Sequence, residues 1–145
     1  LSGNGKYEIT EEMKAQLADF YGNFASEAET AAEIRRLYEK CGYVIDTHTA
    51  VASAVYGKYV VETGDHKTTV IASTASPFKF AGTVYRALTG ENAASDADAL
   101  NQLAALTKAR IPYPLAGLAK RPVRFTRVCE VNEMRDVVME FVKKK

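Results

Sequence analysis

Apolar side chains recur at helical spacing in several stretches of the chain, and most of these stretches follow a residue that caps helices well. The clearest is residues 27–41, which follow a Ser26/Glu29 capping box and end before Gly42, a residue suited to a left-handed C-terminal position. The same pattern predicts about six helices in all. The others are expected over residues 11–22 after Thr10, 47–61, 77–89 after Ser76, from 95 until the Pro-rich segment 111–114, and from Asn132 onward.

A short β-branched run, residues 68–72, predicts one buried strand just before Ser76 and Pro77. Residues 123–128 alternate imperfectly and fit either an edge strand or a covering loop. The expected fold is therefore a helix-rich α/β arrangement, with few strands flanked by about six helices. A lone strand leaves its backbone donors and acceptors unpaired, so we expect it to pair with strands from elsewhere.

Composition and charge narrow the class of protein. The 145 residues are 47% hydrophobic and 26% charged, as in an ordinary globular domain, and we treat 1–145 as a single domain. The net charge of +1 gives no electrostatic reason to expect nucleic acid or an acidic membrane surface. No apolar run approaches the roughly 20 residues of a membrane-spanning helix, and no leader pattern opens the sequence, so we expect a cytoplasmic location.

The two cysteines, Cys41 and Cys129, lie far apart without metal-ligand spacing. We therefore expect no disulfide and no metal site, and two reduced, partly buried thiols. The acidic residues are scattered along helix faces without a pair that stands out for acid–base chemistry, so we interpret them as solvated surface.

Two motifs carry the strongest functional signal. Residues 45–52 read IDTHTAVA, and residues 71–80 read IASTASPFKF. The pair resembles the C-terminal signature of threonine synthases, approximately I-D-P-H-T-A-V followed by S-T-A-H-P-A-K-F, and the resemblance extends over roughly residues 29–88. Thr47 and Ser76 depart from that signature, because the family commonly has proline and histidine there.

The resemblance implies a C-terminal fragment of a larger fold-type II enzyme, tryptophan synthase beta-like in fold, that uses pyridoxal 5'-phosphate. The parent enzyme would be a carbon–oxygen lyase that converts O-phospho-L-homoserine and water to L-threonine and phosphate. Its Schiff-base lysine lies early in a longer chain. Lys79 is not that lysine, since it belongs to the second motif and is followed by Phe80 instead of the aspartate that follows the Schiff-base lysine in this family. The start at Leu1 rather than at a methionine is a further indication of a fragment. We expect the missing N-terminal part of the same polypeptide to be the partner of this chain. We also expect the fragment alone to be inactive and not to bind the cofactor.

Ser73 and Thr74 are the candidate cofactor-binding residues. They follow the predicted strand at its carboxyl end, where open α/β sheets bind ligands. By resemblance, a hydroxyl here hydrogen-bonds the pyridine nitrogen of the cofactor, with Thr74 the first choice and Ser73 the second. The alternative is that both hydroxyls merely satisfy a turn or cap the next helix.

His48 and Lys79 are candidate substrate-binding residues that could contact the substrate phosphate. The alternatives are a hydrogen bond from His48 to its neighbour Asp46 and a solvated Lys79. We expect no catalytic residue in this chain. Two other functions stay open: a non-catalytic, synthase-like binding or scaffold module, and another fold-type II lyase acting on an activated amino acid.

Overall fold

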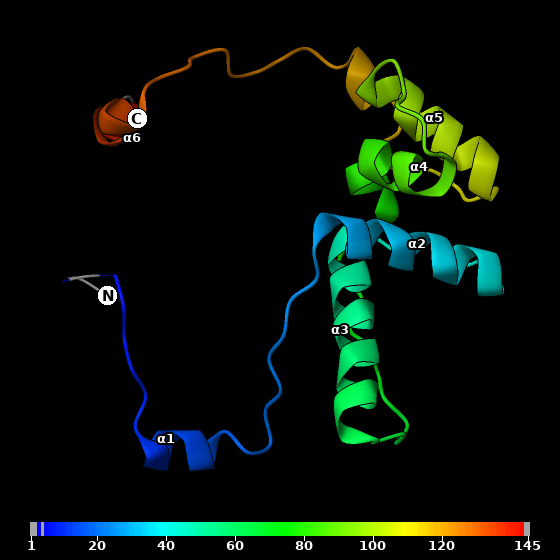
Figure 1. The fold of residues 1–145 in the computed structure, drawn as a ribbon. Coiled ribbons are helices and arrows are strands. Elements are labelled where there is room, and N and C mark those ends of the chain that lie inside the picture. Colours follow the sequence, from blue (N-terminus) through cyan, green and yellow to red (C-terminus); the bar gives the residue numbers. More distant parts are fainter. Residues whose placement is uncertain (1–2, 4, 144–145) are drawn as a thin grey trace.

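The structure is a computed structural model that describes residues 3 and 5–143. Within these residues it contains six α-helices, three short 3₁₀ helices (η) and no strand (Figure 1). The elements are α1 (Glu11–Gln16), α2 (Glu27–Cys41), α3 (Thr47–Thr63), η1 (Pro77–Phe80), α4 (Ala81–Thr89), α5 (Asp96–Thr107), η2 (Leu118–Lys120), η3 (Val131–Glu133) and α6 (Met134–Lys143). The helix-rich character and the number of helices predicted from the sequence are confirmed.

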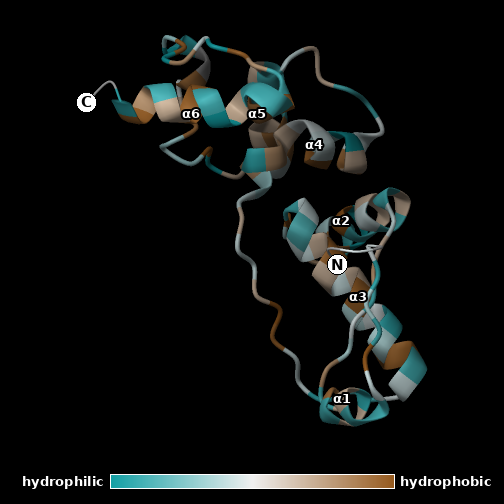
Figure 2. Cartoon of the chain, turned by 90° about the vertical axis from the view of Figure 1, so that its left-hand side faces the viewer, coloured by the Kyte–Doolittle hydropathy of each residue, from teal (hydrophilic) through white to brown (hydrophobic). Residues whose placement is uncertain are grey.

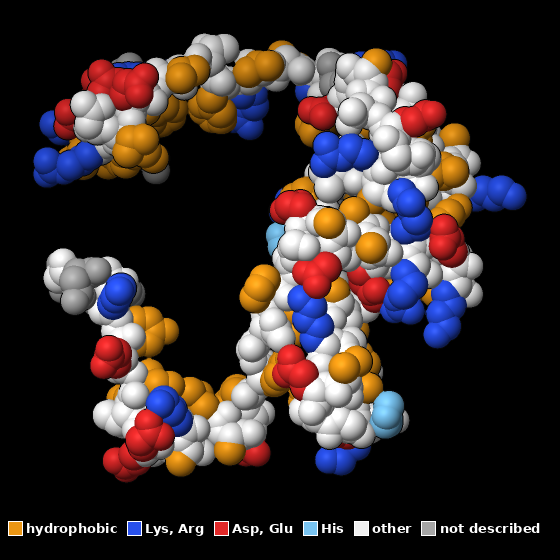
Figure 3. Space-filling model, in the orientation of Figure 1, with side chains coloured by type: hydrophobic (Ala, Val, Ile, Leu, Met, Phe, Trp, Pro, Cys, Tyr) orange, Lys and Arg blue, Asp and Glu red, His pale blue; other side chains and the backbone are white. Residues whose placement is uncertain are grey.

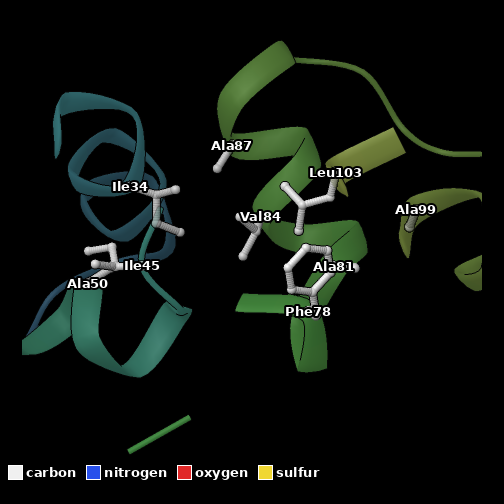
Figure 4. Close-up of a cluster of buried hydrophobic side chains, with 9 residues drawn as sticks. All are labelled: Ile34, Ile45, Ala50, Phe78, Ala81, Val84, Ala87, Ala99 and Leu103. Carbon is white, nitrogen blue, oxygen red and sulfur yellow. The ribbon is translucent and has the colours of Figure 1, made fainter. Parts of the chain in front are cut away.

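The hydrophobic core lies between four consecutive helices. Helix α2 packs against both α3 and α4, and α4 packs in turn against α5. In Figure 4, Ile34, Ile45 and Ala50 come from α2, the α2–α3 connection and α3, and they lie opposite Val84 of α4. The rest of the core comes from η1, α4 and α5: Phe78, Ala81, Ala87, Ala99 and Leu103.

Helix α2 begins and ends where the sequence predicts. The backbone N–H of Glu29 donates to the Ser26 hydroxyl at 3.3 Å, and the Ser26 N–H donates to the Glu29 carboxylate at 2.7 Å, so the capping box is complete. Gly42 ends the helix at φ 69°, in the left-handed region that favours glycine. These interactions are local, so the sequence pattern alone locates them.

Replacing Ser26 by alanine should lower the free energy of unfolding by about 1 kcal/mol, because the orphan amide of Glu29 loses its side-chain acceptor. Urea denaturation followed by circular dichroism measures the change. Ser26→Thr retains a capping hydroxyl and should lose much less stability. Equal stabilities of Ser26→Ala and the unmodified chain would contradict this role of the cap.

Two apolar arms extend from the core: the N-terminal arm, residues 5–24, and the C-terminal arm, residues 121–143. Figure 3 shows hydrophobic side chains on the sides of the arms that face the open space between them, and Figure 2 shows apolar and polar residues alternating along α6. Phe20 is 76% exposed, and Phe141, which contacts Phe125 at 5.9 Å between ring centroids, is 57% exposed. The arms therefore gain little burial from the rest of the described chain.

Both arms contain helix boundaries that differ from the predictions. Thr10 caps α1 as predicted, but the helix ends at Gln16 rather than near Gly22, because so short and exposed a helix has no packing to extend it. In the C-terminal arm, Asn132 does not cap α6. Glu130 instead forms a capping box with Glu133 around η3, and α6 begins at Met134. Lys144 and Lys145, which belong to the segment predicted to be helical from Asn132 onward, lie outside the described residues.

The predicted strand over residues 68–72 is wrong for this structure. The segment has no regular secondary structure, and the side chain of Val70 is 91% exposed. Residues 123–128 also form no strand, which leaves the loop alternative for them. A β-branched run becomes a strand only where a second extended backbone pairs with it, and no strand is present among the described residues.

Other sequence predictions concern the cysteines, metal ligands and membrane helices. Both thiols are free, as predicted, but only Cys129 is partly buried. Cys41 is exposed at the end of α2, where its thiol contacts the Leu37 carbonyl at 3.0 Å, so its predicted burial is wrong. Across residues 3 and 5–143, no group of three or more potential ligands could hold a metal ion. No helix in this part of the chain has the length and apolar character needed to cross a membrane.

Candidate functional site

A fully buried carboxylate organises the start of α3. Asp46 is the N-cap of this helix, and its Oδ1 accepts hydrogen bonds from the backbone amides of His48 at 2.9 Å and Thr49 at 3.4 Å. Its Oδ2 accepts a short hydrogen bond from the Thr49 hydroxyl. A negative charge at the positive end of a helix is favourable, so the cap anchors the first motif.

The hydrogen bonds keep Asp46 ionised despite its burial. Burial by itself raises the pKa of a carboxyl group, but the Thr49 hydroxyl, the two backbone amides and the His48 ring together outweigh it. The pKa of Asp46 therefore lies below its ordinary value of 3.8. At neutral pH this side chain is an acceptor only.

Ser73 joins the same network from the second motif. Its hydroxyl oxygen lies 3.0 Å from that of Thr49. A threonine hydroxyl has one hydrogen, and the Asp46 carboxylate can only accept, so Thr49 donates to Asp46 and accepts from Ser73. The Ser73 hydrogen is thus committed within the protein, and this residue holds the second motif against the first.

Thr74, the next residue, is exposed and makes no hydrogen bond within the described part of the chain. Capping of the following helix does not need it, because the Ser76 hydroxyl accepts from the backbone N–H of Phe78 at 3.3 Å. The capping role considered for Ser73 and Thr74 therefore belongs to Ser76. Of the two adjacent hydroxyls, the one on Thr74 is available to a ligand.

His48 is part of the network and is also open to solvent. Its Nδ1 lies 3.2 Å from Oδ1 of Asp46, which confirms the hydrogen bond considered as an alternative from the sequence, and its side chain is 66% exposed. The ring also packs on Phe80, with 5.0 Å between centroids. The contact to Asp46 occupies Nδ1, so Nε2 is the ring nitrogen available to a ligand.

Lys79 is linked to His48 through Phe80. Its ammonium nitrogen is 5.3 Å from the centroid of the Phe80 ring, the ring that also contacts His48. The structure therefore brings His48, Ser73 and Lys79 together around the start of α3, with Thr74 beside Ser73 in the chain. This cluster is the candidate functional site.

Three residues that hold the site together were not singled out from the sequence as site residues: Asp46, Thr49 and Phe80. A recognisable signal exists for Asp46, because aspartate is a preferred N-cap residue and here it directly precedes a stretch predicted to be helical. The contact of Phe80 with both His48 and Lys79 depends on the turn at η1, and no local pattern indicates it.

A second buried carboxylate, Glu33, lies between α2 and α3. It accepts two hydrogen bonds of 2.7 Å from the Arg36 guanidinium and one of 2.5 Å from the Ser53 hydroxyl. The hydrogen bonds from Arg36 are the largest cause that holds its pKa below the ordinary value. The interpretation of all acidic residues as solvated surface is wrong for Glu33 and Asp46. Glu33 has its partners within the protein and joins the two helices.

Comparison with known proteins identifies the family of this chain. Residues 49–142, well over half of the chain, match the family model described as threonine synthase, C-terminal. The chain belongs to this family. The matched residues include Ser73, Thr74 and Lys79, and His48 lies immediately before them.

The relatives are several times longer than the segment that matches this chain. Threonine synthase of Saccharomyces cerevisiae (strain ATCC 204508 / S288c) is 32% identical over 96 residues, which cover 62% of this chain and 19% of that protein. Threonine synthase-like 1 of Homo sapiens is 40% identical over 70 residues, which cover 48% of this chain and 9% of that protein. The chain thus spans about a fifth or less of the length of these curated relatives.

Proposed function

We propose that this chain is the C-terminal part of a threonine synthase, whose complete form converts O-phospho-L-homoserine and water to L-threonine and phosphate. The family match supports this assignment, and the free hydroxyl of Thr74 beside an anchored Ser73 is the structural observation that carries it. The preceding part of the same polypeptide would supply the Schiff-base lysine and most substrate contacts. On this proposal the chain by itself has no turnover.

The described residues fit one end of pyridoxal 5'-phosphate. When bound, this group supplies an electron sink for bond breaking next to the amino-acid carbon skeleton. Thr74 would donate its hydroxyl hydrogen to the pyridine nitrogen and so leave the ring uncharged, whereas a carboxylate at this position would favour the protonated ring. Ser73 would position Thr74 through its hydrogen bond to Thr49.

His48 and Lys79 would contact the substrate phosphate. The start of a helix attracts anions, but the amides of His48 and Thr49 already donate to Asp46, whose own charge opposes a second anion at that point. A phosphate near α3 would therefore depend on side chains rather than on the helix backbone. The Nε2 atom of His48 and the ammonium group of Lys79 are the donors available on this side.

Thr74 provides the sharpest test. In the full-length polypeptide that carries this chain, purified with pyridoxal 5'-phosphate, Thr74→Ala should lower phosphate release from O-phospho-L-homoserine by about ten- to a hundredfold. The lost interaction is the hydrogen bond to the pyridine nitrogen. A steady-state phosphate assay measures the rate.

Two variants serve as controls for that test. Thr74→Ser keeps the hydroxyl and should keep most of the rate, whereas Thr69→Ala removes another exposed threonine hydroxyl from the same segment and should change little. A Thr74→Ala rate equal to that of Thr69→Ala would remove the assigned role of Thr74. No phosphate release from the unmodified full-length polypeptide would overturn the proposed function itself.

A non-catalytic, synthase-like module is the second candidate. It is favoured by Thr47 and Ser76, which replace the proline and histidine common in the family, and Ser76 has the purely structural task of capping η1. Titration of the full-length polypeptide with pyridoxal 5'-phosphate separates the two, because a scaffold would give no visible absorbance from lysine-bound cofactor. Another lyase of the same fold type would instead bind cofactor and prefer a different activated amino acid in parallel assays.

A further inference from the structure

Three tyrosines wall a pocket on α3, separate from the cluster around Asp46. The rings of Tyr21 and Tyr59 meet edge to face with 5.1 Å between centroids, and those of Tyr56 and Tyr59 stack at 6.4 Å. The pocket has a volume of about 480 Å³, and Val55 and Ile71 add apolar walls. It thus offers several aromatic surfaces around one space.

Carboxylates surround these rings. The Tyr21 hydroxyl donates to Glu62 at 2.6 Å, and the Tyr59 hydroxyl donates to Asp65 at 2.9 Å. Asp19 lines the pocket directly. A phenol that donates to a carboxylate has a more electron-rich ring, and the hydrogen bond to Glu62 is the main reason why the pKa of Tyr21 is raised.

Two lysines lie near these carboxylates and offset them only in part. The Lys67 ammonium is 3.6 Å from Asp65. Lys58 forms a 2.7 Å ion pair with Glu29 and donates to the Phe24 carbonyl at 2.8 Å. Asp19 and Glu62 thus leave the surroundings of the pocket with an excess of negative charge.

We propose that this pocket binds an organic cation, namely an alkylammonium or a guanidinium group. Aromatic faces attract cations through their quadrupole, and more strongly where part of the site is desolvated. The surrounding carboxylates add attraction for a positive charge and oppose an anion. The apolar walls favour a cation that carries alkyl groups over a small inorganic ion.

Paired probes that differ in charge but not in shape test the proposal on the 145-residue chain. In isothermal titration calorimetry, the cation of at least one pair should bind about tenfold more tightly than its neutral counterpart. The pairs are choline with 3,3-dimethylbutanol and N-acetylarginine amide with N-acetylcitrulline amide. A preference for choline indicates a free quaternary ammonium ligand, and a preference for the arginine probe indicates a side chain of another polypeptide. Equal binding within both pairs, or no binding of either cation, overturns the proposal.

Substitutions locate the binding. Tyr59→Leu removes the ring that contacts both others, and Tyr21→Leu removes a wall that lies in the N-terminal arm, outside the hydrophobic core, so this variant is expected to stay folded. Each should weaken cation binding about tenfold, whereas Tyr113→Leu, at a residue 84% exposed and not in the pocket lining, should not. Unchanged binding by folded Tyr21→Leu would also overturn the proposal. The readout is cation binding, so the result is independent of whether the parent releases phosphate.

Discussion

Replacing Asp46 by alanine lowers the free energy of unfolding by about 3 kcal/mol, and we expect this to be one of the two largest effects of any single substitution in the chain. The variant loses a helix cap and leaves the buried Thr49 hydroxyl and the amides at the start of α3 without their acceptor. Urea denaturation followed by circular dichroism at 222 nm, which reports helix content, measures the loss.

Two matched variants separate the cap from the charge. Asp46→Asn keeps a side-chain oxygen at the cap position and should lose only about 1 kcal/mol, because asparagine caps helices nearly as well as aspartate. Asp96→Ala removes an exposed aspartate from the first turn of α5 and should lose still less. If Asp46→Ala were as stable as Asp96→Ala, the network around Asp46 would not stabilise the fold.

The same residue gives a signature in acid. Its pKa is lower in the folded chain than the ordinary value of 3.8, so the folded state binds fewer protons there, and its contribution is fully present only above the unfolded pKa. The contribution is lost as pH falls through the folded pKa. The stability difference between the unmodified chain and Asp46→Asn should therefore stay constant above about pH 5 and shrink as the pH falls below 3.8 and through the folded pKa.

Leu103→Ala should be similarly damaging, with a loss of about 3 kcal/mol. Leu103 is fully buried on the α5 side of the core, and its truncation leaves a cavity between α5 and α4. The same denaturation experiment measures the change. Leu106→Ala, three residues later on the same helix and 37% exposed, is the matched control and should lose much less. Equal losses for the two would show that α5 does not depend on its buried face.

The elements that could be predicted from the sequence are those fixed by neighbours within one or two turns. The capping box at Ser26, the left-handed Gly42 and the Thr10 cap depend on residues at most four positions away. The end of α1 and the start of α6 were misplaced because apolar spacing continues beyond the residues that the helices include. Periodicity shows that a helix can form, but packing decides how far it extends.

The predicted strand fails for a different reason. Residues 68–72 have the composition of a buried strand, yet Val70 is almost fully exposed. Strand propensity reflects the fit to a pleated surface made by other strands, and no sequence pattern within this segment states whether those strands are present.

The candidate site was only partly predictable. The motif pair led to Ser73, Thr74, His48 and Lys79. It does not distinguish Ser73 from Thr74, because that difference depends on the hydrogen bond between Ser73 and Thr49, which occupies the Ser73 hydroxyl and not the Thr74 hydroxyl. The burial of Asp46 and Glu33 was missed because a carboxylate within a helical pattern resembles a surface residue until its partners are known. Beside their local partners, the two groups have long-range contacts, between Thr49 and Ser73 in the Asp46 network and between Glu33 and Ser53, that join residues 20 or more positions apart along the chain.

The family match begins at Thr49, inside α3, whereas the packed core begins earlier. Helix α2 contributes Ile34, and the Arg35 guanidinium donates to the Ala87 carbonyl at 3.0 Å across the α2–α4 contact. A polypeptide trimmed to the matched segment would forfeit that helix and also the N-cap of α3. The segment that matches the family therefore begins more than one helix later than the segment that packs as a unit. A truncated chain intended to keep the fold should begin before Ser26, the N-cap of α2.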